Sequence, residues 1–130
     1  MEKTGGVIEQ FFDRLAVGEW LGLGALIAPE FERVGPWGDR MTGRDTYLEM
    51  MAASDAGETG VQRSSWEVHR IAYAADGHSG FARVTAHPRR GPLSEFEEVL
   101  TFMMDDEGLV SRVEVFWQTP QYAPESLTSS

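Results

Sequence analysis

ERVGPWGDRMTGRDTYLEMM, residues 32–51, is the stretch of sequence that decides the fold. It reads as the end of a strand, a Gly-Pro-Trp-Gly turn at residues 35–38, and a new helix that runs to about Ala53. Thr42 and Asp45 resemble a capping box at the start of this helix. Helical patterns precede the stretch and long strands follow it. This order of elements predicts a curved sheet covered by helices, with a pocket between the two layers.

Two short helices are expected before the turn. Apolar residues repeat at helical spacing over residues 7–15, with Thr4 as a candidate N-cap and Gly18 as a suitable end. A second helix is expected from Trp20 to about Ala28, although its internal glycines weaken the pattern. Phe31–Val34 then reads as a strand that enters the turn.

The second half of the chain changes from helical to alternating periodicity, which is typical of strands. The pattern predicts strands at residues 63–74, 79–87, 95–104 and 109–118, joined as antiparallel hairpins. We find no internal repeat, and the length fits one domain. The expected organisation is a single domain over residues 1–119 and a C-terminal tail over residues 120–130.

Composition excludes several classes of function. The chain has 130 residues, no cysteine and a net charge of −10, so thiolate catalysis, disulfides and cysteine-based metal sites are excluded. The acidic charge argues against nucleic acid and anionic membrane surfaces as partners. No signal peptide or membrane-spanning stretch is apparent, so the cytoplasm is the expected location. No metal-binding spacing, phosphate loop or dinucleotide motif is present, and we expect neither metal nor cofactor.

Strand parity predicts which side chains face the core. In 95–104 the even positions carry most of the large apolar residues, so Glu98 is expected to face inward with Leu100. In 109–118 the same reasoning turns Val113, Val115 and Trp117 inward. Strand 79–87 is ambiguous from parity alone, because each of its faces carries apolar side chains.

The motifs GPWGDRMTGRDTYL and DDEGLVSRVEVFW, together with the order of elements, resemble the nuclear transport factor 2-like superfamily. Polyketide cyclases, ketosteroid isomerases and limonene epoxide hydrolases belong to it, and the likeness covers roughly residues 5–119. The resemblance implies an α+β fold of the cystatin-like barrel type. In this fold a strongly curved mixed or antiparallel sheet wraps around N-terminal helices and forms a conical pocket. It also implies a homodimer that forms through the outer face of the sheet.

The functional positions of the characterised members are altered in this chain. The resemblance puts Phe11 where the isomerases have a tyrosine oxyanion donor, Gly35 at their aspartate base and Leu100 at their protonated aspartic acid. None of these side chains handles a proton, so that mechanism is disfavoured. The epoxide hydrolases need an inward Arg-x-Asp and a further Asp, where this chain has residues 83–85, Arg-Val-Thr, and Val115.

The same alignment implies that Arg83, Thr85 and His87 face inward beside Glu98. His87 would then move a proton, while Arg83 and Glu98 would position the substrate and set the charge of the histidine. Two simpler interpretations remain open. His87 would merely end a strand in solvent, or Arg83 and Glu98 would form an ion pair without a chemical role.

An enclosed pocket of this kind predicts a set of substrate-binding side chains. Those expected to line it are Phe11, Trp37, Tyr47, His69, Thr85, Leu100, Val113, Val115 and Trp117. Trp66 and the Met50-Met51 pair would line the pocket or pack in the core, and His69 would lie at the rim or in a pair on the outer sheet face.

The expected function is that of a cofactor-independent cyclase- or isomerase-like enzyme that acts on a small hydrophobic, polycyclic or polyketide-like molecule. One alternative is a pocket that binds a hydrophobic ligand without converting it. The other is an assembly module, in which an outer sheet face with Val84, Val99 and Phe116 docks a second copy or another protein.

Overall fold

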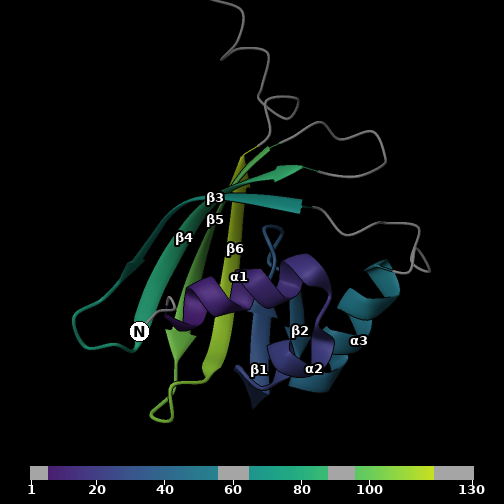
Figure 1. The fold of residues 1–130 in the computed structure, drawn as a ribbon, viewed down its shortest axis with the longest axis horizontal. Helices are drawn as coiled ribbons and strands as arrows, with labels where there is room; N and C mark the ends of the chain where they lie inside the picture. The colour runs from purple at the N-terminus through teal and green to yellow at the C-terminus, as the bar shows by residue number, and fades with distance from the viewer. Residues whose placement is uncertain (1–5, 56–64, 88–95, 119–130) are drawn as a thin grey trace, which may run out of the picture.

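The computed structural model describes residues 6–55, 65–87 and 96–118 of the protein, and it contains three helices and one sheet within these ranges (Figure 1). The elements are α1 (Val7–Val17), α2 (Trp20–Gly24), β1 (Ile27–Val34), β2 (Arg40–Thr42), α3 (Arg44–Asp55), β3 (Ser65–Tyr73), β4 (Ser79–His87), β5 (Phe96–Met104) and β6 (Val110–Gln118). Thr4 and the predicted tail, residues 120–130, lie outside the described residues.

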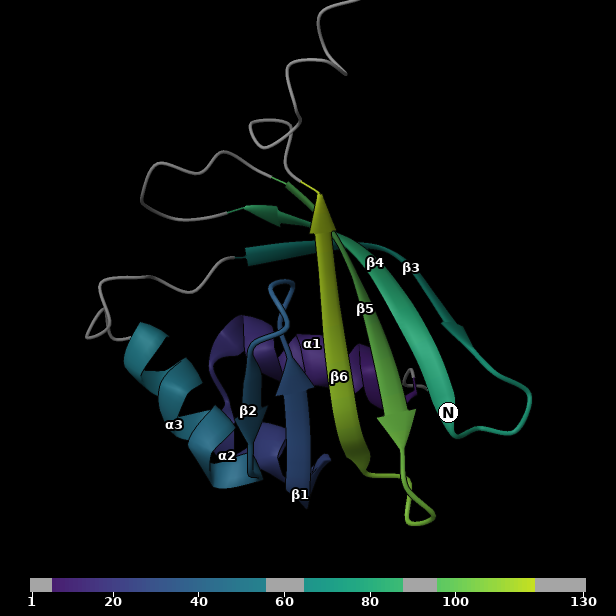
Figure 2. The ribbon, with the colours of Figure 1, turned by 180° about the vertical axis from the view of Figure 1, so that it is seen from behind.

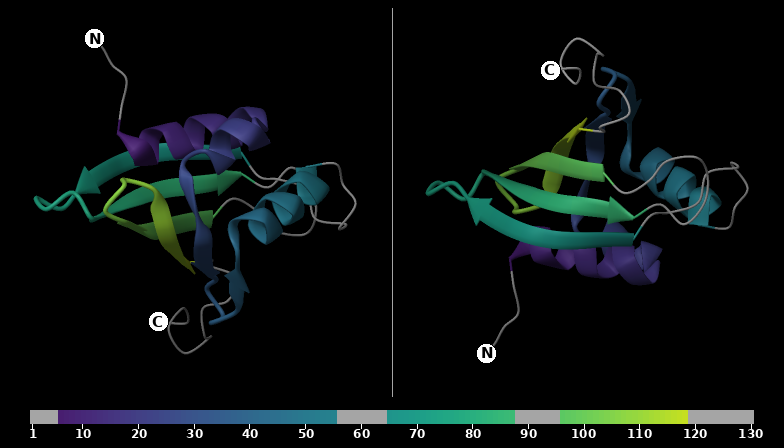
Figure 3. Two further views of the ribbon diagram at one scale, coloured as in Figure 1. Left: turned by 90° about the horizontal axis from the view of Figure 1, so that it is seen from below. Right: turned by 90° about the horizontal axis from the view of Figure 1, so that it is seen from above.

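The strands form one curved, open sheet in the order β2-β1-β6-β5-β4-β3 (Figures 2 and 3). All neighbouring strands are antiparallel except β1 and β6, which are parallel. The predicted α+β fold with a curved, mixed sheet is therefore confirmed. The sheet is not a closed barrel, because β2 and β3 are its two edges.

Glycines set the boundaries of the elements around the turn. Gly18, with φ of 71°, ends α1 as predicted. The predicted Gly-Pro-Trp-Gly turn is also confirmed, with a hydrogen bond of 3.0 Å from the Gly38 amide to the Gly35 carbonyl. The N-cap of α3 is Gly43 instead of Thr42, because the Gly43 carbonyl accepts the first helical bond, from the Tyr47 amide, at 3.1 Å.

The second helix is shorter than predicted. It ends at Gly24, and β1 already begins at Ile27, which pairs with Val110 of β6. Glycine disfavours continuation of a helix, and the strand pairing buries Ile27 and Ala28 completely. Tertiary pairing therefore overrides the apolar pattern that favoured a longer helix.

The helices lie on one face of the sheet and divide it between them. α1 packs on β3 and β4, whereas α3 packs on β1 and β2 (Figure 3). Below α1 the core is closed by aromatic rings, since Phe11 and Phe12 both meet Phe102 edge to face, with centroids 5.3 and 6.1 Å apart. The inner face of β5 and β6 between the two helices is where the molecule has room for a cavity.

Tyr73 fastens the start of α1 to the edge of the sheet. Its hydroxyl accepts a hydrogen bond from the Ile8 amide at 3.0 Å and donates one to the Glu9 carboxylate. Burial and the Glu9 hydrogen bond raise the pKa of Tyr73 to about 12, so the phenol stays protonated. A strand residue thus satisfies an amide that the helix itself leaves without a partner.

Candidate functional site

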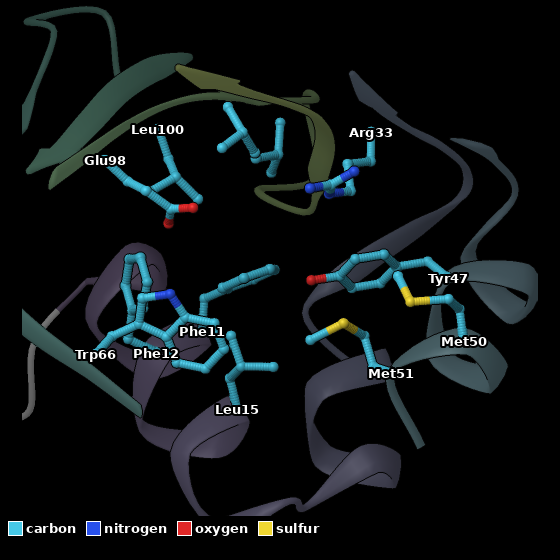
Figure 4. A pocket seen from close by; sticks show the side chains of 12 residues that line it. Phe11, Phe12, Leu15, Arg33, Tyr47, Met50, Met51, Trp66, Glu98 and Leu100 are labelled. Atoms are coloured by element: carbon cyan, nitrogen blue, oxygen red, sulfur yellow. The ribbon is translucent and has the colours of Figure 1, made fainter. Parts of the chain in front are cut away.

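A cavity of about 130 Å³ lies between α1, α3 and the inner face of β1, β5 and β6 (Figure 4). Its apolar wall consists of Phe11, Phe12, Leu15, Met50, Met51, Leu100, Val113 and Val115. Its polar groups belong to Arg33, Tyr47, Trp66 and Glu98. A mostly apolar cavity with a few converging polar groups is the usual form of a small-molecule site.

The sheet register explains why the strand residues meet there. Leu100 of β5 pairs with Val115 of β6, and alternation turns Glu98 and Val113 to the same side. α1 and α3 contribute Phe11 and Tyr47 from opposite sides of the cavity. Strand parity therefore predicted the inward direction of Glu98, Leu100, Val113 and Val115 correctly. Backbone pairing sets Trp117 opposite Glu98, but the Trp117 side chain lies outside what the structure describes.

Glu98 is the acidic group of the cavity. Its carboxyl group lies among apolar side chains and points toward Trp66 (Figure 4). Burial raises the pKa of Glu98 above its ordinary value of 4.5, while a hydrogen bond from Trp66 and the positive charge of Arg33 act in the opposite direction. A carboxyl group with a raised pKa in a cavity is suited to accept and return a proton.

Tyr47 brings a hydroxyl group into the same space. Its ring lies near those of Phe11 and Phe31, with centroid distances of 6.5 and 5.0 Å. The hydroxyl points into the cavity (Figure 4). Burial raises the pKa of Tyr47 to about 12; the Arg33 charge lowers it, and the Glu98 charge raises it further. The hydroxyl therefore keeps its proton near neutral pH and can donate it in a hydrogen bond.

Arg33 is a cavity residue that sequence analysis missed. It lies on β1 opposite Val113 of β6, and its side chain is 25% exposed. It forms an ion pair with Asp39, with 3.7 Å between Nη1 and Oδ2. The signal was present in the sequence, because parity with Phe31, a fully buried residue, turns Arg33 to the inner face.

The orientation that the resemblance implied for strand 79–87 is wrong. Ala82 and Val84 point inward and are fully buried, whereas the Arg83 side chain is 59% exposed on the outer face. The inner side of β4 lies under α1, where only small side chains fit. Arg83 pairs with Glu97, Nε to Oε1 at 3.8 Å. The predicted catalytic cluster of Arg83, Glu98 and His87 is therefore not formed.

His87 also lies on the outer side of the sheet. Its Nε2 atom is 3.4 Å from Oε1 of Glu67 on β3, and the Glu67 side chain is largely exposed. The register agrees, because His87 and Arg83 occupy alternate positions of β4 on the side opposite Val84. His87 is thus separated from the cavity by the sheet, and nothing in this geometry gives it contact with a molecule bound there.

His69 and Thr85 form part of a polar row on the outer face, which was one of the alternatives left open for His69. The Thr85 hydroxyl donates to Oε2 of Glu97 at 2.7 Å, and it is 2.6 Å from Nε2 of His69. Since that hydroxyl has one proton, Nε2 of His69 is the donor in the second bond. His69 occupies the irregular position between Val68 and Arg70 in β3. Thr85 and His69 therefore do not line the cavity.

Trp37 was also expected at the cavity and is not found there. It lies in the turn between β1 and β2, and it is 70% exposed. Trp66, which the sequence left between core and pocket, does line the cavity, as do Met50 and Met51.

The described residues contain neither a metal-binding group of side chains nor a membrane-spanning helix. Within residues 6–55, 65–87 and 96–118, no group of three or more histidine, aspartate or glutamate side chains is arranged to hold a metal ion. None of the helices in the same ranges has the length and apolar character needed to cross a bilayer.

Solved structures resemble this chain over most of its length. A candidate ketosteroid isomerase from Kribbella flavida DSM 17836 is 28% identical, with a TM-score of 0.69, and the match covers 91% of this chain and 78% of that one. A steroid delta-isomerase from Pseudomonas aeruginosa is 19% identical, with a TM-score of 0.67 and coverage of 88% and 79%. A candidate polyketide cyclase from Xanthomonas campestris pv. campestris is 14% identical, with a TM-score of 0.68, and the match covers 86% of this chain and 87% of that one.

These likenesses at low identity establish the fold and leave the activity open. Among proteins with curated descriptions, none matches the chain significantly. The model of the SnoaL-like domain matches residues 8–113, which include α1, the β1–β2 turn and most of the cavity wall. Its fold is also that of a nuclear transport factor 2-like protein from Cytophaga hutchinsonii. The chain therefore belongs to the SnoaL-like domain family.

Proposed function

We propose that the protein is a cofactor-independent enzyme of the isomerase or cyclase kind, which transfers a proton next to a carbonyl group in a small, mostly apolar molecule. The observation that carries the proposal is the carboxyl group of Glu98, held in an apolar cavity that the Tyr47 hydroxyl also enters. Similarity to steroid isomerase and polyketide cyclase structures is consistent with this class of reaction.

Glu98 replaces His87 as the group that moves the proton. In its ionised form Glu98 takes a proton from the carbon beside the carbonyl, so that the C–H bond breaks and the electron pair delocalises onto the oxygen. Tyr47 donates a hydrogen bond to this enolate oxygen. Return of the proton from Glu98 to another carbon gives an isomer. Attack of the enolate carbon on a second carbonyl instead closes a ring: the π bond of that carbonyl breaks, and its oxygen takes the proton from Glu98. A raised pKa makes Glu98 a stronger base.

The size of the cavity limits the substrate. About 130 Å³ is well below the roughly 300–1,000 Å³ typical of pockets for drug-sized ligands. We therefore expect a substrate of one or two rings, or a short chain, in place of the larger polycyclic molecule that the sequence suggested.

Deuterium exchange tests the proposed reaction directly. We would incubate the protein with 2-tetralone, an enolisable bicyclic ketone, in D2O and follow the loss of its α-proton signals by NMR. The wild type should accelerate exchange above the buffer rate, and Glu98→Gln should lower the enzymatic rate by about 100-fold or more. Glu97→Gln is the matched control, because it makes the same change one residue away on the opposite face.

Two results would count against the enzyme. Equal exchange by wild type and Glu98→Gln would remove the proposed role of Glu98. Saturable binding of 2-tetralone without any exchange would favour the alternative, in which the cavity binds a ligand and does not convert it.

We also propose that two copies associate through the outer face of the sheet. Val99 and Phe116 are cross-strand neighbours on β5 and β6, and Phe116 is 54% exposed. Covering such an apolar pair stabilises an assembly. Val84, which was expected on this face, is buried on the other. Sedimentation should give a dimer for the wild type and a monomer for Phe116→Glu, whereas a monomeric wild type at micromolar concentration would contradict the proposal.

A further inference from the structure

We propose that the natural ligand of the cavity carries a carboxylate group, which pairs with Arg33 while the remainder of the molecule extends to Tyr47 and Glu98. The substrate class would then be a small keto acid with an apolar spacer. The inference deepens the proposed function, since it rests on the use of this cavity as the ligand site. It does not depend on which reaction follows.

The first support is that the protein itself uses little of the hydrogen-bonding capacity of the Arg33 guanidinium group. A guanidinium group has several N–H donors in a planar fork that matches a carboxylate. Within the described residues, the one ion pair of Arg33 is with Asp39 at 3.7 Å, which is longer than a hydrogen bond. Because the side chain lines the cavity, its donors are available to a ligand.

The second support is the balance of charge around the cavity. The chain as a whole carries a net charge of −10, and yet the ionisable side chains at the cavity wall are Arg33, Tyr47 and Glu98. Tyr47 is neutral, so Arg33 and Glu98 are the groups there that can carry charge. Arg33 is the positive one of the two, and in an apolar space its attraction for an anion is stronger than in water.

The third support is the position of Asp39. Its carboxylate lies against Gly35 in the β1–β2 turn, where any residue with a side chain would collide with it, and its side chain is largely exposed. This carboxylate is not among the residues that line the cavity, and it already attracts Arg33 from outside. A ligand carboxylate that approaches from within the cavity would compete with it.

The sheet register places Arg33 and Glu98 at different positions along the cavity. Arg33 pairs with Val113 on β6, whereas Glu98 pairs with Trp117, four residues further along the same strand. This offset corresponds to about 13 Å along the strand, and both side chains extend into the cavity between them (Figure 4). A ligand with its acid at one end and its carbonyl at the other would bridge the two groups.

Calorimetric binding of a matched pair of probes tests the inference. 2-Naphthoate and 2-naphthamide share one ring system and differ in charge. The wild type should bind the carboxylate about 10- to 100-fold more tightly, the factor expected for hydrogen bonds to a charged group. Arg33→Met should remove this preference and keep the affinity for the amide. Asp39→Asn should tighten binding of the carboxylate, because it removes the competing group.

Arg40→Met is the control, since Arg40 pairs with Glu32 at 2.6 Å and does not line the cavity; it should leave both affinities unchanged. Equal binding of the two probes by the wild type, or a preference that survives Arg33→Met, would overturn the inference. The deuterium exchange test is independent of this result. If the wild type prefers the carboxylate probe but does not accelerate deuterium exchange, only the proposed reaction is rejected. If it accelerates exchange but shows no preference for the carboxylate, only the role of Arg33 is rejected.

Discussion

The inner and outer faces of β5 place the same chemical group in two different settings one residue apart. On the outer face, Glu97 accepts a hydrogen bond from Thr85 and pairs with Arg83. On the inner face, Glu98 lies in an apolar cavity. There it accepts a hydrogen bond from Trp66, and Arg33 is the positive charge that acts on it. Polar residues on the outer face contact one another in a row, although Oε1 of Glu97 is buried there without a hydrogen bond. The polar groups of the inner face instead converge on one cavity, which is why we place the site there.

The largest change in the free energy of unfolding should come from a substitution in the packed core on the inner face of the sheet. Phe102→Ala removes a fully buried ring that meets Phe11 and Phe12, and it should lower the free energy of unfolding by about 3–5 kcal/mol. Met103→Ala, the next residue on the outer face, should change it by no more than about 0.5 kcal/mol. Urea denaturation at a concentration where the protein is monomeric measures both, and similar losses would mean that the two faces are not distinct.

An intermediate effect on the free energy of unfolding should distinguish the polar groups of the outer face from those of the cavity. Thr85→Val removes the hydroxyl that joins Glu97 and His69, at a cost of about 1–2 kcal/mol. Tyr47→Phe should cost no more than about 0.5 kcal/mol, because its hydroxyl points into the cavity. The same urea experiment applies, and a larger cost for Tyr47→Phe would indicate a structural role for that hydroxyl.

The smallest effect should be a pH dependence of stability that Glu98 introduces. Burial raises the pKa of Glu98 in the folded protein above 4.5, so the folded state holds the proton more tightly than the unfolded state does. The contribution of Glu98 to stability is therefore most favourable below pH 4.5, and it declines as pH rises toward the raised pKa.

Glu98→Gln removes this proton linkage. The variant should gain stability relative to the wild type as pH rises from 4.5 to 8, with Glu97→Gln as the matched comparison. Thermal unfolding across this pH range measures the difference, and a gain that appears instead as pH falls would show that the folded protein favours the ionised form of Glu98.

Sequence patterns predicted the elements well where periodicity is strong and poorly where contacts decide. β4 was located correctly, and the observed β5 and β6 begin one residue after the predicted strands. Parity also placed Glu98 and Val115 correctly. It could not orient β4, because the deciding fact is that α1 covers one side and leaves room for small side chains only. The alignment to relatives then gave the wrong face.

Strand β2 and the cavity residue Arg33 were not predicted from the sequence. β2 is only three residues long and has no pattern of its own, since it exists by pairing with β1. Arg33 was not predicted because alternation was applied to the strands of the second half of the chain and not to Phe31–Val34. The two groups that carry the proposed chemistry, Glu98 and Tyr47, were both named from the sequence, but the role of Glu98 depends on a cavity that only the three-dimensional arrangement reveals.

The most direct test of the account is the titration of Glu98 itself, followed through its side-chain carboxyl carbon by 13C NMR and assigned with Glu98→Gln. We predict a pKa clearly above 4.5, which rises further when Arg33 is replaced by Met. A pKa at or below 4.5 in the wild type would mean that the carboxyl group is well solvated or firmly paired, and it would contradict the proposal that the inner face holds an acid–base group for catalysis.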